Sequence, residues 1–309
     1  MVIENNTAPE ITVFIVHWNR PEQFKKTIES YLAQTNCLLR FVIWDNGSSP
    51  ENLKQLKAAL PSGSQLFEGS ENLGWGKAFN KMLSGWLEEN SGHFCLISAH
   101  DALTMPSCIE ILWTTMKADP QIGIASPDHS GQALMTTYSP LRGAKVKATD
   151  KDKVSSVEEI PYAHGTLFMV RKQCLSDIGL FDERFFAYGD EADLSLRARE
   201  RHWKVVICHQ AEITNPISGT AKPALFYLDA RNSLLLAQKH GGRIKSFLRS
   251  LIVCTASLTR LLIGKDIDIE KAKLCGIRDY YLRRWGAPPA NLKLLLKEPT
   301  ALTSGVEHE

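Results

Sequence analysis

The sequence predicts an α/β fold in which helices flank a mostly parallel, Rossmann-like central sheet, followed by a helical C-terminal extension. Short apolar runs rich in β-branched residues alternate with amphipathic segments of helical period along the first half of the chain. Connections of this length favour parallel pairing of successive strands. The 309 residues are 44% hydrophobic and 23% charged, which is an ordinary globular composition.

The first strand and the first helix follow from two neighbouring segments. Residues 11–16 form a near-continuous apolar run, typical of a strand that is covered on both faces. Pro21 then opens a helix, because its missing N–H removes no hydrogen bond at that position. One face of this helix is apolar, since it carries Phe24, Ile28, Tyr31 and Leu32 at helical spacing.

The same alternation predicts the remaining elements. Further strands are expected at residues 41–44, 94–97, 166–170 and 205–208, and further helices from Pro50 and at residues 77–89, 106–116, 172–178 and 190–202. Residues 127–160 show weak periodicity and predict a mobile, solvated loop. The chain is predicted to be helical from about Tyr227. We therefore expect an α/β domain over residues 8–225, a helical extension over residues 226–297 and a flexible tail over residues 298–309.

Charge and cysteine usage exclude several function classes. Lys+Arg at 36 against Asp+Glu at 34 leave a net charge of +2, which predicts no nucleic-acid partner. The seven cysteines contain no CxxC pair and indicate buried, unpaired thiols in a reducing compartment. The N-terminus lacks an apolar signal core, and the longest apolar stretch, residues 247–263, contains two arginines. We therefore expect a cytoplasmic protein without a membrane-spanning helix.

Ligands of parallel sheets bind at the carboxyl ends of the strands, which points to residues 17–19, 45–48 and 98–101. Asp45 can accept hydrogen bonds from a base or a ribose, although the motif taken alone favours a simple Asx turn. Asp101 can hold Mg²⁺ or Mn²⁺, or can cap the following helix. Residues 72–76 carry two glycines at a helix start, where backbone amides can bind a diphosphate.

Residues 179–194 form the most informative stretch, because three acids stand at the start of a predicted helix. Asp190 is suited to cap that helix. Capping by Asp190 leaves the two further acids, Glu191 and Asp193, unexplained. It also leaves unexplained the aromatic run and Gly189 that precede them. A helix N-terminus favours an ionised carboxylate, as a general base requires.

Together these segments resemble family-2 glycosyltransferases of the GT-A fold, particularly the bacterial rhamnosyltransferase-like branch. The similarity runs from Ile11 to about Thr220. The matching segments are residues 16–20, 33–35, 42–48 and 72–74, the Asp101 segment and residues 181–197.

The resemblance implies a role for each candidate residue. The nucleoside-diphosphate sugar donor would bind to His17, Asn19, Asp45, Asn46, Asn72, Gly74, Asn80, His100 and Asp101. Asp101 would match the last acid of a DxD-type motif and bind a divalent metal, Mg²⁺ or Mn²⁺. A glycan or lipid-linked acceptor would contact His164, Gly165 and Asp193. The base would be Glu191 by position or Asp190 by side-chain type, and we favour Glu191.

The implied activity is inverting transfer of a hexose or deoxyhexose to an acceptor hydroxyl, in the assembly of cell-surface polysaccharide. The chain departs from the family pattern at Ala99, at Asn215 and in the order Asp190–Glu191. The first two departures favour an alternative, a catalytically degenerate nucleotide-sugar-binding protein. A sugar nucleotidyltransferase is a second alternative, but residues 17–20 lack the Gly-rich loop that it would need.

Basic and apolar residues gather in the C-terminal extension. Lys239, His240, Arg243, Lys245 and Arg249 precede or enter an apolar segment that contains Leu248, Leu251, Ile252, Leu258, Leu261 and Leu262. This combination predicts an interfacial helix on the inner face of a membrane. Packing against the α/β domain, or against a second copy in a homodimer, is the alternative.

Overall fold

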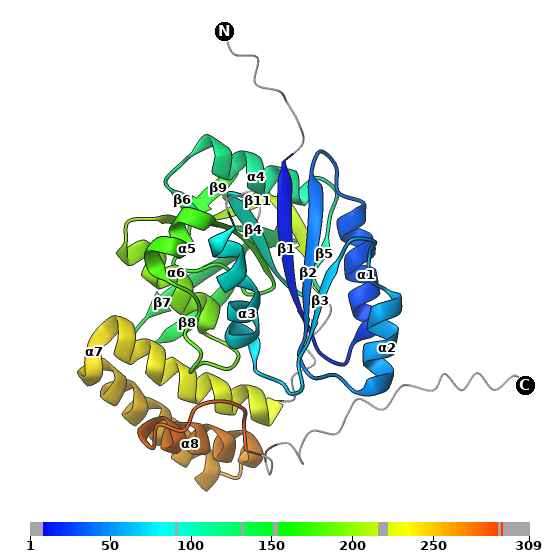
Figure 1. Ribbon diagram of the computed structural model, residues 1–309. Helices are drawn as coiled ribbons and strands as arrows, with labels where there is room; N and C mark the ends of the chain where they lie inside the picture. The colour runs from blue at the N-terminus through cyan, green and yellow to red at the C-terminus, as the bar shows by residue number, and fades with distance from the viewer. Residues whose placement is uncertain are drawn as a thin grey trace, which may run out of the picture.

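A central sheet is flanked by helices on both faces, and a pair of C-terminal helices follows at one end of it (Figure 1). The computed structural model describes residues 9–89, 92–130, 133–150, 154–215, 222–289 and 292. The expected tail at residues 298–309 lies outside them. The strands are β1 (Glu10–His17), β2 (Leu38–Asp45), β3 (Gln65–Glu68), β4 (Phe94–Ala99), β5 (Leu103–Thr104), β6 (Ile122–His129), β7 (Ala133–Ser139), β8 (Gly143–Thr149), β9 (Val157–Glu159), β10 (Leu167–Arg171) and β11 (Lys204–Thr214). The helices are α1 (Pro21–Leu32), α2 (Pro50–Ala58), α3 (Trp75–Glu88), α4 (Cys108–Ala118), α5 (Lys172–Ile178), α6 (Asp190–Glu200), α7 (Lys222–Leu262) and α8 (Ile267–Tyr281).

The sheet is mixed and mostly parallel, as predicted. Its strand order is β3-β2-β1-β4-β10-β6-β11-β5, and β9 pairs with β11. Strands β1, β2, β3, β4, β6 and β11 run in one direction, whereas β10 lies antiparallel between β4 and β6. The carboxyl ends of the parallel strands therefore meet at one edge, where we expected the ligand.

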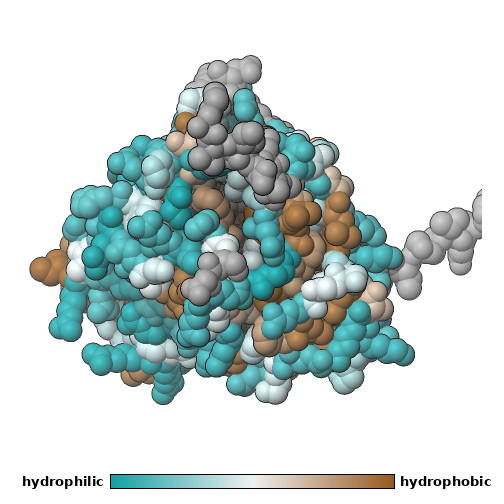
Figure 2. Space-filling model, turned by 45° about the horizontal axis from the view of Figure 1, so that its top comes forward, coloured by the Kyte–Doolittle hydropathy of each residue, from teal (hydrophilic) through white to brown (hydrophobic). Residues whose placement is uncertain are grey.

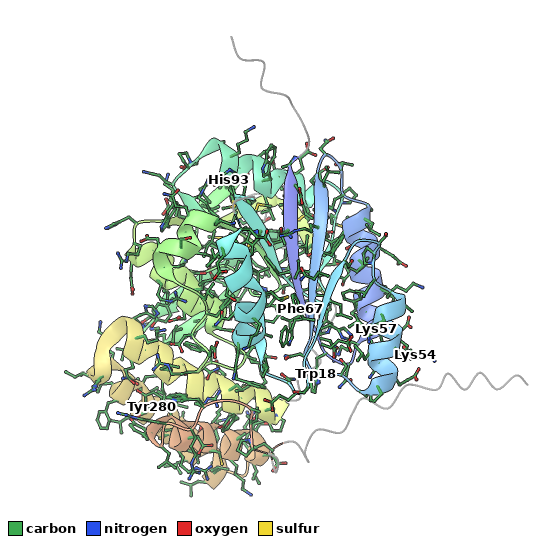
Figure 3. All side chains as sticks on the ribbon, viewed as in Figure 1. Trp18, Lys54, Lys57, Phe67, His93 and Tyr280 are labelled. Atoms are coloured by element: carbon green, nitrogen blue, oxygen red, sulfur yellow. The ribbon has the colours of Figure 1, made fainter. Side chains whose placement is uncertain are left out.

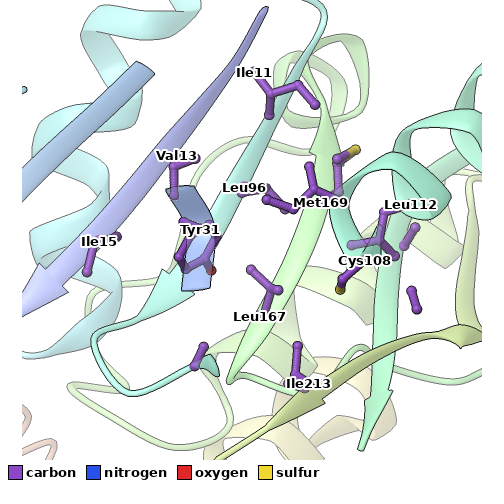
Figure 4. Packing of buried hydrophobic residues seen from close by; sticks show 14 of the residues in the cluster. Ile11, Val13, Ile15, Tyr31, Leu96, Cys108, Leu112, Leu167, Met169 and Ile213 are labelled. Carbon is purple, nitrogen blue, oxygen red and sulfur yellow. The ribbon is translucent and has the colours of Figure 1, made fainter. Parts of the chain in front are cut away.

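Both faces of the sheet carry an apolar core. Successive side chains of β1 alternate between the faces. Ile11, Val13 and Ile15 pack with residues of α1, α2 and α4 (Figure 4). Phe14 and Val16 pack on the other face, against α3, α5 and α6. This two-sided cover explains the continuous apolar run of residues 11–16.

The expectation of a solvated loop over residues 127–160 is wrong. Most of β6 is buried in the sheet, and β7 and β8 form an antiparallel hairpin in which Thr136 pairs with Val146. The hairpin packs on the C-terminal helices, because the Tyr138 hydroxyl donates to the carbonyl of Leu236 and the Arg249 guanidinium donates to that of Leu141. These partners are distant in the sequence, so local periodicity did not show the strands.

The C-terminal extension is a helix pair that packs on the α/β domain through one part of α7. Leu234 and Leu235 of α7 are fully buried. Helix α8 lies close against α7 at Gly276, where an added Cβ would stand 2.3 Å from the carbonyl oxygen of Tyr227. Gly242, with φ 86°, interrupts α7 and separates the packed part from the rest of the helix.

Hydrophilic residues cover most of the surface seen in Figure 2, and hydrophobic residues form smaller patches among them. No helix in the described ranges is both long enough and apolar enough to cross a membrane. All seven cysteines are unpaired, as expected, and four of them are buried.

Candidate active site

The carboxyl ends of β1 and β2 bring His17 and Asp45 together, since the two residues are direct partners in the parallel register. His17 Nδ1 lies 3.0 Å from Asp45 Oδ1, and the backbone amide of Arg20 donates to His17 Nε2 at 3.2 Å. The proton of the imidazole therefore lies on Nδ1, which donates to Asp45. The Ser48 hydroxyl donates to the same carboxylate at 2.6 Å.

These hydrogen bonds keep Asp45 ionised. Burial raises the pKa of its carboxyl group, but the hydrogen bonds from His17 and Ser48 outweigh burial and hold the pKa below its usual range. Asp45 is only 1% exposed. The edge of the sheet thus carries a fixed negative charge, held by its own neighbours.

Most of the predicted donor-binding amides hold loops in place. Asn46 Nδ2 donates to Asn72 Oδ1 at 3.0 Å and to the carbonyl of Gly74 at 3.1 Å, and Asn46 Oδ1 accepts from the amide of Leu73. Gly74 has φ 85°, and an added Cβ would stand 2.3 Å from the carbonyl oxygen of Phe186. The loop before α3 is therefore fixed against the loop before α6, and position 74 requires glycine.

Asn80 and Asn19 also connect segments. Asn80 Nδ2 donates to the carbonyl of Phe181 at 2.9 Å, and Asn80 Oδ1 accepts from its amide at 3.0 Å. Asn19, whose φ is 52°, accepts from the backbone amide of Ser49 at 2.8 Å and so joins the end of β1 to the start of α2. Both amides thus position backbone around the site.

His100 and Asp101 follow β4 at the same edge. Burial, with a smaller effect of His17, lowers the pKa of His100 to about 3, so its imidazole is neutral. His100 Nδ1 lies 3.3 Å from the carbonyl of Val16, while Nε2 is buried with no partner in the described ranges. Burial raises the pKa of Asp101, and the charge of Arg20 opposes this rise.

Asn215 lies beside this segment, because β5 and β11 pair antiparallel up to Leu103 and Thr214. Its Nδ2 donates to Thr166 Oγ1 at 3.0 Å, whereas its Oδ1 is buried without a partner among the residues described. His164 Nδ1 lies 3.0 Å from the same hydroxyl, and burial together with His129 lowers the pKa of His164 to about 4. A neutral imidazole and an unused amide oxygen therefore lie close to Thr166, directly before β10.

The three acids at the start of α6 have three different surroundings. Gly189 is the N-cap, with φ 91°, so the expectation that Asp190 caps the helix is wrong. Asp190 is 1% exposed and points toward Gly76 at the start of α3. Burial and the neighbouring charge of Glu191 raise its pKa well above the usual range, so the helix N-terminus does not keep this acid ionised.

Glu191 is half-buried and lies next to Gly165, where an added Cβ would stand 3.4 Å from the Glu191 carboxyl carbon. The Gly189 amide donates to Glu191 Oε2 at 3.0 Å. Asp193 is instead fully buried, with Arg197, Lys239 and His240 around it. The structure thus brings Glu191 and Gly165 together and places Asp193 in an ion cluster between α6 and α7.

A family model described as glycosyl transferase family 2 matches residues 12–179. The chain belongs to this family. It is 22% identical over 301 residues to the low-salt glycan biosynthesis hexosyltransferase Agl10 of Haloferax volcanii, covering 93% of this chain and 95% of the relative. It is also 22% identical over 270 residues to an N-acetylglucosaminyl-diphospho-decaprenol L-rhamnosyltransferase of Mycobacterium tuberculosis. This match covers 77% of this chain and 88% of the relative.

Two solved glycosyltransferase structures share the fold at 14% identity. The mannosyltransferase PcManGT from Pyrobaculum calidifontis, in complex with GDP-Man and Mn²⁺, matches with a TM-score of 0.59 over 89% of this chain and 87% of its own. GalNAc-T7 with UDP, GalNAc and Mn²⁺ matches with a TM-score of 0.62 over 96% of this chain and 59% of its own. The transferase therefore has the predicted GT-A architecture.

The transferase offers a partial set of ligands for a divalent cation. Within the described ranges, no group of three or more His, Cys, Asp or Glu side chains could hold a metal ion. Asp101 and the unused Oδ1 of Asn215 do lie at adjoining strand ends. Hard cations accept carboxylate and amide oxygens, and often complete their coordination with phosphate and water. These two residues would fit such a cation if a bound diphosphate and water supplied its other ligands.

Sequence reasoning assigned no role to three positioning groups of the transferase. Arg20 acts on Asp101 from the end of β1. Arg231 and Asn232 of α7 are buried, and both donate to the carbonyl of Phe185 in the acid loop, residues 179–189. An Arg-Asn pair inside an apolar helical stretch was the available signal, since buried polar groups need partners.

Proposed function

We propose that the transferase inverts the anomeric centre as it moves a hexose or deoxyhexose from a nucleoside diphosphate to an acceptor hydroxyl. The observation that carries this proposal is the position of Glu191, a half-buried carboxylate beside Gly165 at the start of α6. A carboxylate that stays accessible can remove the acceptor proton, whereas the buried Asp190 holds its own proton. Glu191 is therefore assigned as the base.

On the donor side, Asp45 would fix the nucleotide at the end of β2, and Asp101 with Asn215 Oδ1 would hold Mg²⁺ or Mn²⁺. Such a cation would stabilise the charge that develops on the departing diphosphate. Arg20 would add a positive charge near Asp101. The imidazole of His164 is neutral because of its lowered pKa. It would form a hydrogen bond with the acceptor substrate, as donor or as acceptor of the bond.

The acceptor would be a glycan on a lipid carrier in cell-surface polysaccharide assembly. The relative from Mycobacterium tuberculosis is named for a diphospho-decaprenol substrate, which supports this class of acceptor. Residues 8–225 would form the catalytic domain. Residues 226–297 would attach it to the inner face of the membrane through an exposed apolar surface, which includes Ile244, Leu248, Leu251, Ile252, Leu258, Leu262 and Ile263.

A panel of UDP-, dTDP- and GDP-sugars tests the proposal. In the presence of Mn²⁺, the correct donor at 100 times its Kd should raise the stability of the full chain by about 2.7 kcal/mol, which thermal unfolding detects. The same donor should be hydrolysed slowly without an acceptor. If no nucleotide sugar either stabilises the chain or is consumed by it, the assignment fails.

A further inference from the structure

A cationic pocket of about 660 Å³ lies in the C-terminal extension, apart from the acids of the carboxyl edge. Three arginines line it, namely Arg184 of the acid loop, Arg243 of α7 and Arg283 beyond α8, and no acidic side chain does. Aromatic rings form much of the remaining wall, among them Phe247, Tyr281 and Trp285. Figure 3 labels Tyr280, also in this wall, and Trp18 at the end of β1, and both lie toward the bottom of the view.

The positive charge of the pocket is only partly neutralised. Asp182 binds the guanidinium of Arg184 at 2.6 Å and the ammonium of Lys239 at 2.6 Å, so its single negative charge is already shared. Arg243 and Arg283 are exposed and form no ion pair with the residues described. Two guanidinium groups thus line one pocket without a counter-charge from the part of the chain that the structure describes.

Paired guanidinium groups match the chemistry of phosphate. Each presents a planar fork of N–H donors that binds two oxygens at once, and the bond is stronger because both partners are charged. A diphosphate offers enough oxygens for both arginines. The pocket therefore suits an anion such as a phosphate or diphosphate group better than a neutral sugar.

The pocket is continuous with the exposed apolar surface of α7. Phe247 lines the pocket and is 53% exposed, and Tyr281 lines it and is 52% exposed. Leu248 and Leu251 follow on the same helix and are also exposed. A phosphate attached to a hydrocarbon chain would satisfy both surfaces, whereas a free phosphate would leave the apolar side chains in water.

We propose that this pocket binds the diphosphate of the lipid-linked acceptor at the membrane surface, a proposal that rests on the proposed transferase function. One side chain links the pocket to the active site. Arg231 donates to the carbonyl of Gly286, next to Trp285 in the pocket wall, at 2.8 Å, and to that of Phe185 in the acid loop at 3.1 Å. The wall of the pocket and the loop that precedes Glu191 are therefore held by the same guanidinium.

Vesicle binding by the full chain tests the proposal. Phosphatidylcholine vesicles carry either a polyprenyl diphosphate or phosphatidylglycerol, adjusted to the same surface charge. The wild type should bind the polyprenyl diphosphate vesicles at least about tenfold more tightly, the usual worth of a charge-assisted bond. Arg243→Gln with Arg283→Gln should remove this preference. Lys245→Gln with Lys265→Gln removes two positive charges of the same extension outside the pocket and should retain it.

Each outcome decides the proposal. Equal affinity of the wild type for the two vesicles would mean a general attraction to negative charge and would overturn it. Calorimetry measures the binding of inorganic pyrophosphate to the full chain. If pyrophosphate binds as tightly as the vesicles do, and the same double variant loses this binding, the ligand of the pocket is a soluble anion instead. Should the glutamine variant lower the Tm, Arg243→Lys with Arg283→Lys keeps both charges, loses the forks and should still weaken the preference. Vesicle binding requires no turnover, so this test can fail while donor hydrolysis proceeds. Equally, donor hydrolysis can be absent while vesicle binding is observed.

Discussion

Several polar groups at the carboxyl edge of the sheet are satisfied by one another, whereas apolar groups on the C-terminal extension are left in water. At the edge, His17, Asp45 and Ser48 form a closed set of hydrogen bonds. Among the residues described, eight large hydrophobic side chains are exposed over residues 9–215, but eleven are exposed between Ile244 and Leu282. Such a patch usually marks a surface for a partner. The side chains at the edge are thus fixed by one another, whereas those of the extension are available for contact with a partner.

Removing the proposed base at the edge should have the largest effect, and it should leave the extension unaffected. Glu191→Gln should lower the turnover rate by ~10²–10⁴-fold, the usual contribution of a general base, and leave donor affinity and vesicle binding unchanged. Steady-state kinetics with donor and acceptor varied in turn measure this effect.

Asp190→Asn is the matched control, because an amide replaces an acid that the fold keeps protonated. We expect near-normal turnover and a Tm close to that of the wild type. If this variant alone loses catalysis, the roles of the two acids are reversed.

Replacing the two proposed metal ligands at the edge should give the next largest effect. Asp101→Asn should lower turnover by about 10²–10³-fold, as expected when one group that stabilises developing charge is lost. Asn215→Ala should raise the Mn²⁺ concentration needed for half-maximal rate by about tenfold, and this titration distinguishes a ligand from a positioning residue. Undiminished activity of the wild type in EDTA would exclude the metal.

The extension can be tested without touching the active site. Leu262→Ser with Ile263→Ser removes side chains that are 88% and 69% exposed, and should weaken binding to anionic vesicles by roughly 10–100-fold. The control pair Leu32→Ser and Leu38→Ser, both 62% exposed on the α/β domain, should bind normally. Turnover with a water-soluble acceptor should stay the same in all variants. If sedimentation instead shows a dimer that the first pair dissociates, the surface belongs to a second copy of the chain.

The smallest effect should come from the ion cluster that joins the two regions. Burial lowers the pKa of His240, but its hydrogen bonds to Asp193 and Glu200 outweigh burial and raise the pKa. Stability from a raised pKa is fully present below the unfolded value of about 6.5 and is lost as the pH rises through the folded value. The Tm of the wild type should thus exceed that of His240→Gln by a few degrees at pH 6, and the difference should shrink toward pH 9. A constant difference would show that His240 does not change its protonation state between pH 6 and pH 9.

Periodicity predicted most of the elements because each one alternates or repeats within a few residues. The helix at residues 172–178 has the predicted bounds, and the strand at residues 11–16 lies within β1. Strands β7 and β8 were not predicted because the element that they pack against is α7, about 100 residues further along the chain. The antiparallel orientation of β10 was also not predicted, since the direction of pairing depends on the neighbouring strands and not on the strand itself.

The sequence by itself determined the family, the α/β architecture and the edge at which polar residues gather, because these depend on local pattern and on residue types at the strand ends. Only the tertiary structure distinguished the three acids of α6. Asp190 is buried against α3, Glu191 remains accessible beside Gly165, and Asp193 pairs with cations of α6 and α7. The charge and the accessibility of a carboxyl group depend on burial and on nearby charges, and both are supplied by segments far away in the chain.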